Sequence, residues 1–187
     1  VVMASLGVIK EQKADRRRQA LDVEREGAEL YAKSDFVGAE EKFKQASELD
    51  PENKDYYFKY GVSLYRNQKY NDALVILKLA KVSADKDSER GYYMGLIHYR
   101  LAELDASLKA FSAVAQSKDP VLGPSATFYT GVILFAKEDY DHSKAAFENV
   151  IDTSNDPRWD DQADSYLDRI ATAMAWQKLR EKKFTLI

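Results

Sequence analysis

The side chains that most often carry out catalysis or bind metals are few and scattered in this chain of 187 residues. The absence of cysteine excludes disulfides, thiol catalysis and zinc sites with cysteine ligands. There are two histidines, His98 and His142, and neither has a metal-ligand neighbour at helical spacing. We expect His98 at a position of a core aromatic and His142 at the start of a helix. Carboxylates are numerous, as in DTSND and WDDQAD, but no spacing pairs them in a pocket, and DTSND is typical of a loop and helix cap.

Glycine forms phosphate-binding loops when several glycines are clustered, but here it recurs at long, regular intervals. Gly27, Gly61 and Gly95 are spaced by 34 residues, and Gly131 follows 36 residues later. We therefore predict no cofactor, no metal and no catalytic site, and a protein that is not an enzyme.

The overall composition limits the class of partner. With 45% apolar and 32% charged residues, four prolines and eight glycines, it is typical of an ordered, helical protein. The net charge of -3 provides no general attraction to nucleic acid. A helical-repeat protein that binds RNA is one hypothesis for the function, and the net negative charge disfavours it.

Other positions keep the same distance from each of the four glycines. Bulky residues follow nine positions later, small residues twelve later and Phe or Leu sixteen later: Phe36, Tyr70, Leu104 and Tyr140; Ala39, Ala73, Ser107 and Ser143; Phe43, Leu77, Phe111 and Phe147. Two packed helices account for these columns. Because a helical glycine lets a neighbouring helix approach closely, we expect the small residue of the second helix to face it. The Phe or Leu four residues further on lies on the same face and fills the core.

The period and the order of these columns resemble the tetratricopeptide repeat family. The segment EGAELYAKSDFVGAEEKFKQASELDP matches best and ends in the family's closing proline, Pro51. YGVSLYRNQKYNDALVILKLA matches nearly as well, and MGLIHYRLAELDASLKAFSAVAQSKDP and TGVILFAKEDYDHSKAAFENVIDTSNDP keep the frame. In the last two units Gly91 and Thr127 stand where the family has an early bulky aromatic. The resemblance covers about residues 20–157 and implies an all-α fold, an α-solenoid of about four helix pairs.

This frame predicts a division of the chain into three parts. We expect residues 1–19 to form an N-terminal helical extension or a truncated anchor. We expect residues 20–157 to form the four-repeat array, and residues 158–187 to form a capping helix and tail. The expected helices are 20–33, 37–49, 54–67, 71–83, 88–101, 105–116, 124–136 and 140–152. A longer loop is expected in SKDPVLGPSA because of Pro120, Gly123 and Pro124. Beyond Pro157, an apolar stripe at helical spacing predicts the capping helix: Trp159, Ala163, Tyr166, Leu167, Ile170 and Met174. Trp176 falls off this stripe, and we expect it to be exposed.

The first nine residues are apolar and lead into a basic stretch, Lys10 to Arg18. Nine residues are too few to span a bilayer, which requires about 20. One interpretation is that these residues start a helix that packs on the repeat array. The other is that they belong to a truncated membrane anchor, since the sequence begins with valine. The compartment stays open, and a soluble domain tethered through sequence upstream of residue 1 is compatible with the sequence. Contact with acidic lipid or an acidic partner through residues 1–19 is an alternative to a solvated helix face.

In the family that this chain resembles, the first helices of the units line a concave groove. The resemblance implies that the groove is aromatic and apolar with few charges, and that its residues bind a partner: Tyr31, Phe58, Lys59, Val62, Tyr65, Arg66, Tyr92, Leu96, Tyr99, Arg100, Phe128, Val132 and Phe135. Packing of repeat on repeat is the alternative role for these aromatic residues.

Some members of the family hold a partner's terminal carboxylate with lysine and asparagine. Here the corresponding residues are Glu24, Ala28, Phe58 and Val62, so that clamp is missing. We predict a protein–protein interaction module or adaptor whose groove takes an apolar segment, helical or extended, of another protein or of a second copy. The alternative is a self-associating scaffold, a homo-oligomer that assembles through its terminal helices.

Overall fold

The structure, a computed structural model, describes residues 2–80, 82–117 and 119–184, and these residues form nine helices and no strand. Val1 and residues 185–187, which belong to the predicted N-terminal extension and C-terminal tail, lie outside the described residues. The helices are α1 (Val2–Ala32), α2 (Phe36–Leu49), α3 (Lys54–Arg66), α4 (Tyr70–Leu79), α5 (Ala84–Arg100), α6 (Leu104–Gln116), α7 (Leu122–Ala136), α8 (Tyr140–Thr153) and α9 (Pro157–Phe184). None of the helices searched in these ranges is long and apolar enough to cross a membrane.

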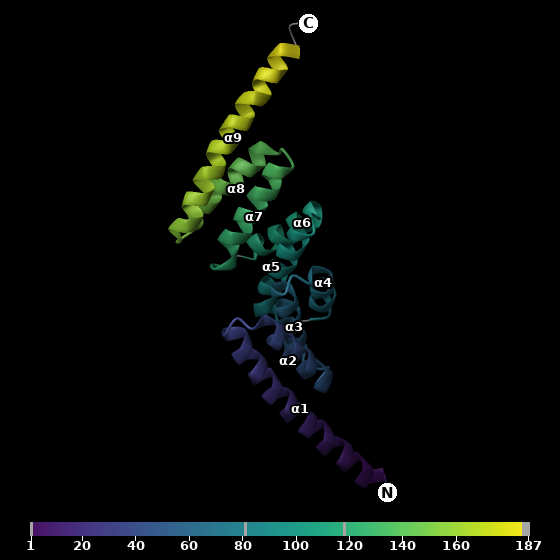
Figure 1. Ribbon diagram of the computed structural model, residues 1–187. Coiled ribbons are helices and arrows are strands. Elements are labelled where there is room, and N and C mark those ends of the chain that lie inside the picture. Colours follow the sequence, from purple (N-terminus) through teal and green to yellow (C-terminus); the bar gives the residue numbers. More distant parts are fainter. Residues whose placement is uncertain (1, 81, 118, 185–187) are drawn as a thin grey trace. The chain divides into compact units, whose positions relative to one another are not determined.

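Within each part of the chain the helices pack mainly on their neighbours in sequence (Figure 1). The chain divides into two compact units, Val1–Tyr93 and Met94–Ile187, and the division falls within α5. In the first unit α1 packs on α2, α2 on α3, and α3 on α4. In the second unit α6 packs on α7, and α9 closes the stack by packing on both α7 and α8. The predicted all-α solenoid is confirmed.

The four periodic glycines are the points of closest approach within the helix pairs. A Cβ atom placed on Gly131 would lie 2.9 Å from Cζ of Phe147, and one on Gly61 would lie 2.7 Å from Cγ of Leu77. Gly27 and Gly95 meet the rings of Phe43 and Phe111 in the same way. The residue sixteen positions after each glycine therefore occupies the space that a side chain there would need.

The small residues of the second helices are buried in all four pairs. Ala39, Ala73, Ser107 and Ser143 are fully buried. In the second unit each serine hydroxyl donates a hydrogen bond to the glycine carbonyl, Ser107 to Gly95 and Ser143 to Gly131, both at 2.8 Å. The hydroxyls thus satisfy their own hydrogen-bonding need in the core.

The turn between the two helices of each pair has one conformation in all four repeats. Ser34, Gln68, Ala102 and Glu138 have φ values of 63°, 61°, 57° and 61°, in the left-handed region. After each of them a backbone N–H bonds back five residues, for example from Asp35 to the Leu30 carbonyl at 2.9 Å. This closure satisfies carbonyls at the end of the first helix. The four residues are of different types, so the sequence shows no common signal for the turn.

Several expected boundaries were wrong. Helix α4 ends at Leu79 rather than at 83, and α5 begins at Ala84 rather than at 88. Helix α7 begins at Leu122, so Gly123 and Pro124 of the expected loop lie in its first turn, where proline is tolerated. Residues 2–19 are a continuous extension of the first helix, so that the expected start at residue 20 was also wrong.

The two terminal helices are about twice as long as the helices on which they pack. Every residue of α1 from Gly7 to Gln19 is exposed, and only Lys13 and Arg17 of this stretch reach back, to Asp50 and Glu52 beyond α2. Residues 175–182 of α9 are likewise exposed, and Figure 1 shows this end running on past α8. Trp176 is 63% exposed, as predicted.

Candidate functional site

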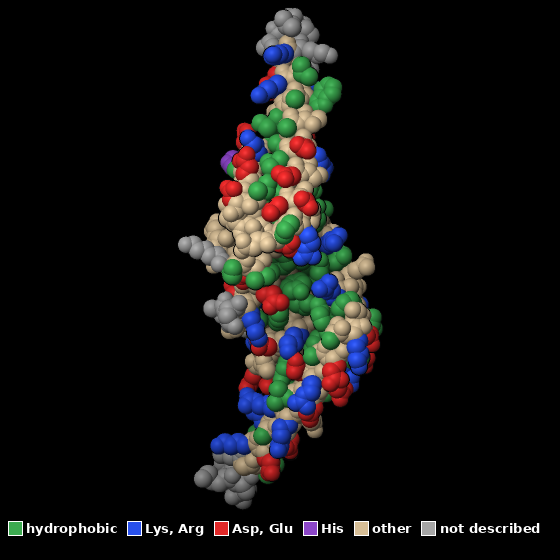
Figure 2. Space-filling view, turned by 90° about the vertical axis from the view of Figure 1, so that its left-hand side faces the viewer, with side chains coloured by type: hydrophobic (Ala, Val, Ile, Leu, Met, Phe, Trp, Pro, Cys, Tyr) green, Lys and Arg blue, Asp and Glu red, His purple; other side chains and the backbone are tan. Residues whose placement is uncertain are grey.

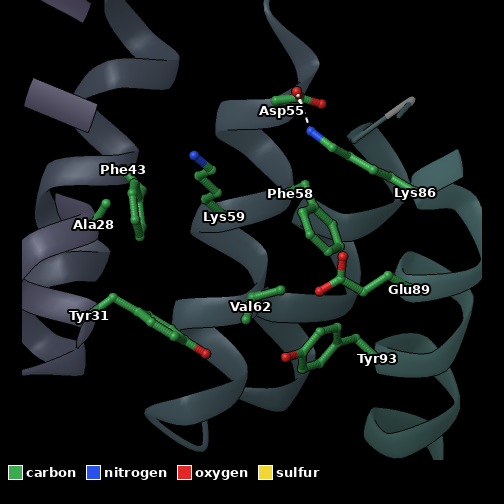
Figure 3. A pocket seen from close by; sticks show the side chains of 10 residues that line it. All are labelled: Ala28, Tyr31, Phe43, Asp55, Phe58, Lys59, Val62, Lys86, Glu89 and Tyr93. Atoms are coloured by element: carbon green, nitrogen blue, oxygen red, sulfur yellow. Dashed lines mark hydrogen bonds and ion pairs between the residues drawn. The ribbon is translucent and has the colours of Figure 1, made fainter. Parts of the chain in front are cut away.

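The first unit contains a pocket of about 350 Å³ between α1, α3 and α5 (Figure 3). It is lined by Ala28, Tyr31, Phe43, Asp55, Phe58, Lys59, Val62, Lys86, Glu89 and Tyr93. Four of the predicted groove residues, Tyr31, Phe58, Lys59 and Val62, thus surround one cavity. Their spacing along α1 and α3 turns them to the same side, because helical residues three or four apart are neighbours on one face.

The floor of this pocket is apolar and closely packed. Phe58 and Val62 are 8% and 7% exposed, and Phe43, which covers Gly27, is 3% exposed. The Phe58 ring packs edge-on against Tyr93, with centroids 6.1 Å apart. These side chains belong to the packing between helices and also line the pocket.

Polar groups of Tyr31 and Tyr93 close one end of the pocket. In Figure 3 the two hydroxyls point toward one another beneath Val62. Burial, together with the nearby Tyr31, raises the pKa of Tyr93 to about 12. Arg66 donates from Nε to the Tyr31 hydroxyl at 3.0 Å, and this bond raises the pKa of the guanidinium. At physiological pH the Tyr93 hydroxyl therefore stays neutral.

Ion pairs mark the opposite end of the pocket. Lys86 Nζ lies 2.7 Å from Asp55 Oδ2, a contact drawn in Figure 3, and Lys59 pairs with Glu24 of α1. Glu24 stands where a carboxylate clamp would carry lysine, so its charge has the opposite sign. Because these charges are paired within the protein, they offer little net attraction to a charged ligand.

The remaining predicted residues of the first unit lie beside the pocket. Tyr65 packs against Tyr93 and Tyr70, with ring centroids 5.6 and 5.9 Å away, and Arg66 is exposed over the Phe36 ring. Tyr92 is half-buried, with its ring 6.4 Å from that of Tyr93. The prediction selected Tyr92 and missed Tyr93, which lines the pocket. Tyr93 precedes its repeat glycine by two residues, as Lys59 does, so that column held the missing signal.

In the second unit most of the predicted residues pack in the helical core. Leu96, Phe128 and Val132 are 8%, 6% and 7% exposed, and the Phe128 ring lies 5.0 Å from Trp159 and 5.8 Å from Tyr166 of α9. Tyr99 is half-buried against Tyr129, and Arg100 is exposed. Phe135, at the end of α7, contacts Tyr140 and Tyr166. The capping helix therefore covers Phe128, Val132 and Phe135 of α7.

The two histidines each lie beside one carboxylate. His98 Nδ1 is 2.5 Å from Glu103 Oε2, with its side chain 13% exposed, and His142 Nδ1 is 2.8 Å from Asp139, which also caps α8. His142 lowers the pKa of the Asp139 carboxyl through their hydrogen bond. Among the described residues, no group of three or more His, Cys, Asp or Glu side chains is placed to hold a metal ion.

Comparison with known proteins identifies the repeat. Residues 25–88 match the profile of the tetratricopeptide repeat. No curated protein sequence is similar enough to count as a relative.

Solved structures share the fold at low sequence identity. A crystal structure of MamA is 20% identical with a TM-score of 0.66, over 91% of this chain and 94% of that one. YrrB, described as a TPR protein with an unusual peptide-binding site, is 20% identical with a TM-score of 0.68, over 88% and 87%. A tetratricopeptide repeat protein from Parabacteroides merdae is 16% identical with a TM-score of 0.72, over 83% and 61%. Residues 25–88 therefore carry the tetratricopeptide repeat pattern, and the chain shares the fold of these solved structures over most of its length.

Proposed function

We propose that this protein is a non-catalytic interaction module that binds an apolar segment of a partner protein in the pocket between α1, α3 and α5. The fold is one used for protein interaction. The observation that carries the proposal is the pocket itself, whose apolar floor is made by Phe43, Phe58 and Val62 and whose charges are mostly paired at its edge. YrrB, which shares the fold, is described by its peptide-binding site.

The pocket favours one bulky apolar side chain as an anchor. Its volume of about 350 Å³ lies at the lower end of the range of small-ligand sites, about 300–1,000 Å³. The hydroxyls of Tyr31 and Tyr93 at one end supply hydrogen bonds for the backbone or a polar neighbour of that anchor. A helix or an extended strand of the partner can present such a side chain.

The test uses peptides displayed at random and selected on the full-length chain. We expect the selected peptides to share a large apolar residue. Ala28→Gln places a polar side chain at the pocket without removing core packing, since Ala28 is exposed, and Tyr31→Ala removes one wall. Both should weaken binding at least about tenfold, which corresponds to about 1.4 kcal/mol.

Ala32→Gln is the matched control, because it makes the same change at another exposed position of α1 that does not line the pocket. Circular dichroism checks that each variant keeps its helices. Peptides that bind Ala28→Gln and Tyr31→Ala as tightly as the unmodified chain would refute the proposal.

A second candidate function is self-association through the terminal helices. Large apolar side chains are exposed on both long ends: Val8 and Ile9 on α1 are 54% and 57% exposed, and Trp176 and Leu179 on α9 are 63% and 53% exposed. Burial of such side chains between copies is favourable. Light scattering over a wide concentration range should show a mass that rises with concentration, and a constant monomer mass would exclude this candidate.

A further inference from the structure

The outer face of α9 is exposed from Asp161 to Lys182. It lies opposite the stripe, Ala163 to Met174, that packs on α7 and α8. The exposed positions on and beside this face are Asp161, Asp164, Asp168, Arg169, Thr172, Ala175, Trp176, Leu179 and Lys182. A terminal helix of a solenoid needs a polar outer face to stay soluble. Trp176 and Leu179 depart from that rule, and hydrophobic side chains break the charged surface toward this end in Figure 2.

A hollow of about 370 Å³ lies on one flank of the same helix, where α9 passes the end of α7. It is lined by Phe135, Asp168, Arg169, Thr172 and Ala173. The Arg169 guanidinium lies over the rings of Phe135 and Tyr166, 4.8 and 4.6 Å from their centroids. An arginine held in this way is a suitable neighbour for a further aromatic ring, and tryptophan is the strongest partner in such cation–π contacts.

Trp176 and the hollow are placed so that, in a pair of α9 helices, the Trp176 side chain of each copy could enter the hollow of the other. Trp176 follows Thr172 by four residues and Arg169 by seven, so all three lie on the same flank of the helix. Seven residues correspond to about 10.5 Å along the axis. If a second α9 runs antiparallel, with the two-fold axis midway between positions 169 and 176, Trp176 of each copy faces Arg169 of the other.

The charged residues along α9 favour the same position of the two-fold axis. Asp164 and Lys182 share the other flank of the outer face, and the midpoint between them, residue 173, nearly coincides with the midpoint between Arg169 and Trp176. Antiparallel pairing sets Asp164 of each copy beside Lys182 of the other, whereas parallel pairing in register sets like charges together. Near the axis, Ala171, Thr172 and Ala175 are small, and small side chains let helix axes approach to about 8 Å.

We propose that a second copy of this chain docks on the outer face of α9, in an antiparallel, two-fold symmetric pair in which Trp176 of each copy enters the hollow beside Arg169 of the other. This interface deepens the self-association candidate and does not depend on the pocket of the first unit. An interface of this symmetry uses the same patch on both copies and closes after two, so the species is a dimer rather than a filament.

Light scattering and sedimentation of the full-length chain test the pairing. The unmodified chain should reach the mass of a dimer as its concentration rises. Trp176→Ala should weaken association at least about tenfold, because a tryptophan that fills a pocket is a typical interface hot spot. Val121→Ala is the matched control, since it truncates another exposed apolar residue of the second unit, 78% exposed and away from α9, and should leave the mass unchanged.

A charge exchange tests the register and direction of the pairing. Asp164→Lys and Lys182→Asp, each alone, place like charges together twice in the dimer and should weaken it. A mixture of the two variants restores opposite charges at both contacts, so it should dimerise more tightly than either variant alone. A chain that carries both Asp164→Lys and Lys182→Asp should also dimerise more tightly than either single variant, because opposite charges again face each other at both contacts.

The outcomes separate the inference from the function on which it rests. A chain that stays monomeric at all concentrations overturns both the α9 pair and self-association. A dimer unaffected by Trp176→Ala overturns the α9 pair but leaves self-association standing. A dimer that depends on Trp176 but shows no recovery when the charge variants are mixed overturns the antiparallel register.

Discussion

The contact between Gly131 and Phe147 should make the substitution of this glycine by alanine destabilising. In an ordinary helix interior alanine is about 1 kcal/mol more favourable than glycine. Here the added Cβ would lie 2.9 Å from Cζ of Phe147 and 3.0 Å from both Cε atoms. The ring has little room to withdraw, because it is fully buried, stacked on Tyr166 at 4.7 Å and edge-on to Phe128 at 5.4 Å.

The expected magnitude is the difference between these two effects. Overpacking of a core costs about 1–3 kcal/mol, from which the helix preference of alanine removes about 1 kcal/mol. We expect Gly131→Ala to lower the free energy of unfolding by about 1–2 kcal/mol, toward the upper end of that difference because the ring is confined. Gly123→Ala, in the first turn of the same helix, is the matched control. A Cβ there meets no atom within 4 Å, so that variant should be unchanged or more stable by up to about 1 kcal/mol.

Urea denaturation followed by circular dichroism measures both variants. Phe147→Leu, introduced with and without Gly131→Ala, completes a double-mutant cycle. We expect Phe147→Leu to cost less in a chain that already carries Gly131→Ala, because the shorter side chain relieves the overlap. A Gly131→Ala variant as stable as Gly123→Ala would refute this account of the periodic glycines.

Two further predictions concern the turn and the buried tyrosine. Ala102→Gly should raise the melting temperature, because Ala102 has a φ of 57°, a conformation that costs an L-residue about 1–2 kcal/mol and that glycine adopts freely; a lower melting temperature would contradict it. Tyr93 has its pKa raised by burial to about 12, so the folded state holds this proton more tightly than the unfolded state, whose tyrosine pKa is about 10. Its contribution to stability is therefore complete below about pH 10 and is lost as the pH rises toward about 12. Urea titrations at several pH values should show a shallower fall in this range for Tyr93→Phe, and equal slopes would argue against a buried neutral Tyr93.

The repeat frame could be predicted because it depends on contacts between neighbouring segments. Each helix pair buries the same few positions, so the glycine, the small residue and the Phe or Leu recur at fixed distances. The capping helix was predictable for the same reason, since Ala163 and Ile170 of its stripe are buried against the last pair. The ends of α4 and α5 were misplaced because no periodic column extends to residues 80–88.

The site could be predicted only in part. Tyr31, Phe58, Lys59 and Val62 surround one pocket, as the resemblance to the family implied, while binding at this pocket remains a prediction. The prediction missed Tyr93 because it selected Lys59, two positions before Gly61, without the equivalent residue two positions before Gly95. Phe128 and Val132 were selected by the same columns, yet α9 covers them, and no column within the repeats indicates what packs on the last one.

The sequence by itself determined the period, the pairing of helices and the apolar stripe of α9, because these follow from local spacing and the burial of one face. The tertiary structure alone decided how closely each side chain approaches its glycine, that Arg66 donates to the Tyr31 hydroxyl, and where a hollow opens beside Arg169. These features depend on side chains brought together from different helices. Their distances are set by the packing of whole helices and not by the spacing of residues along one of them.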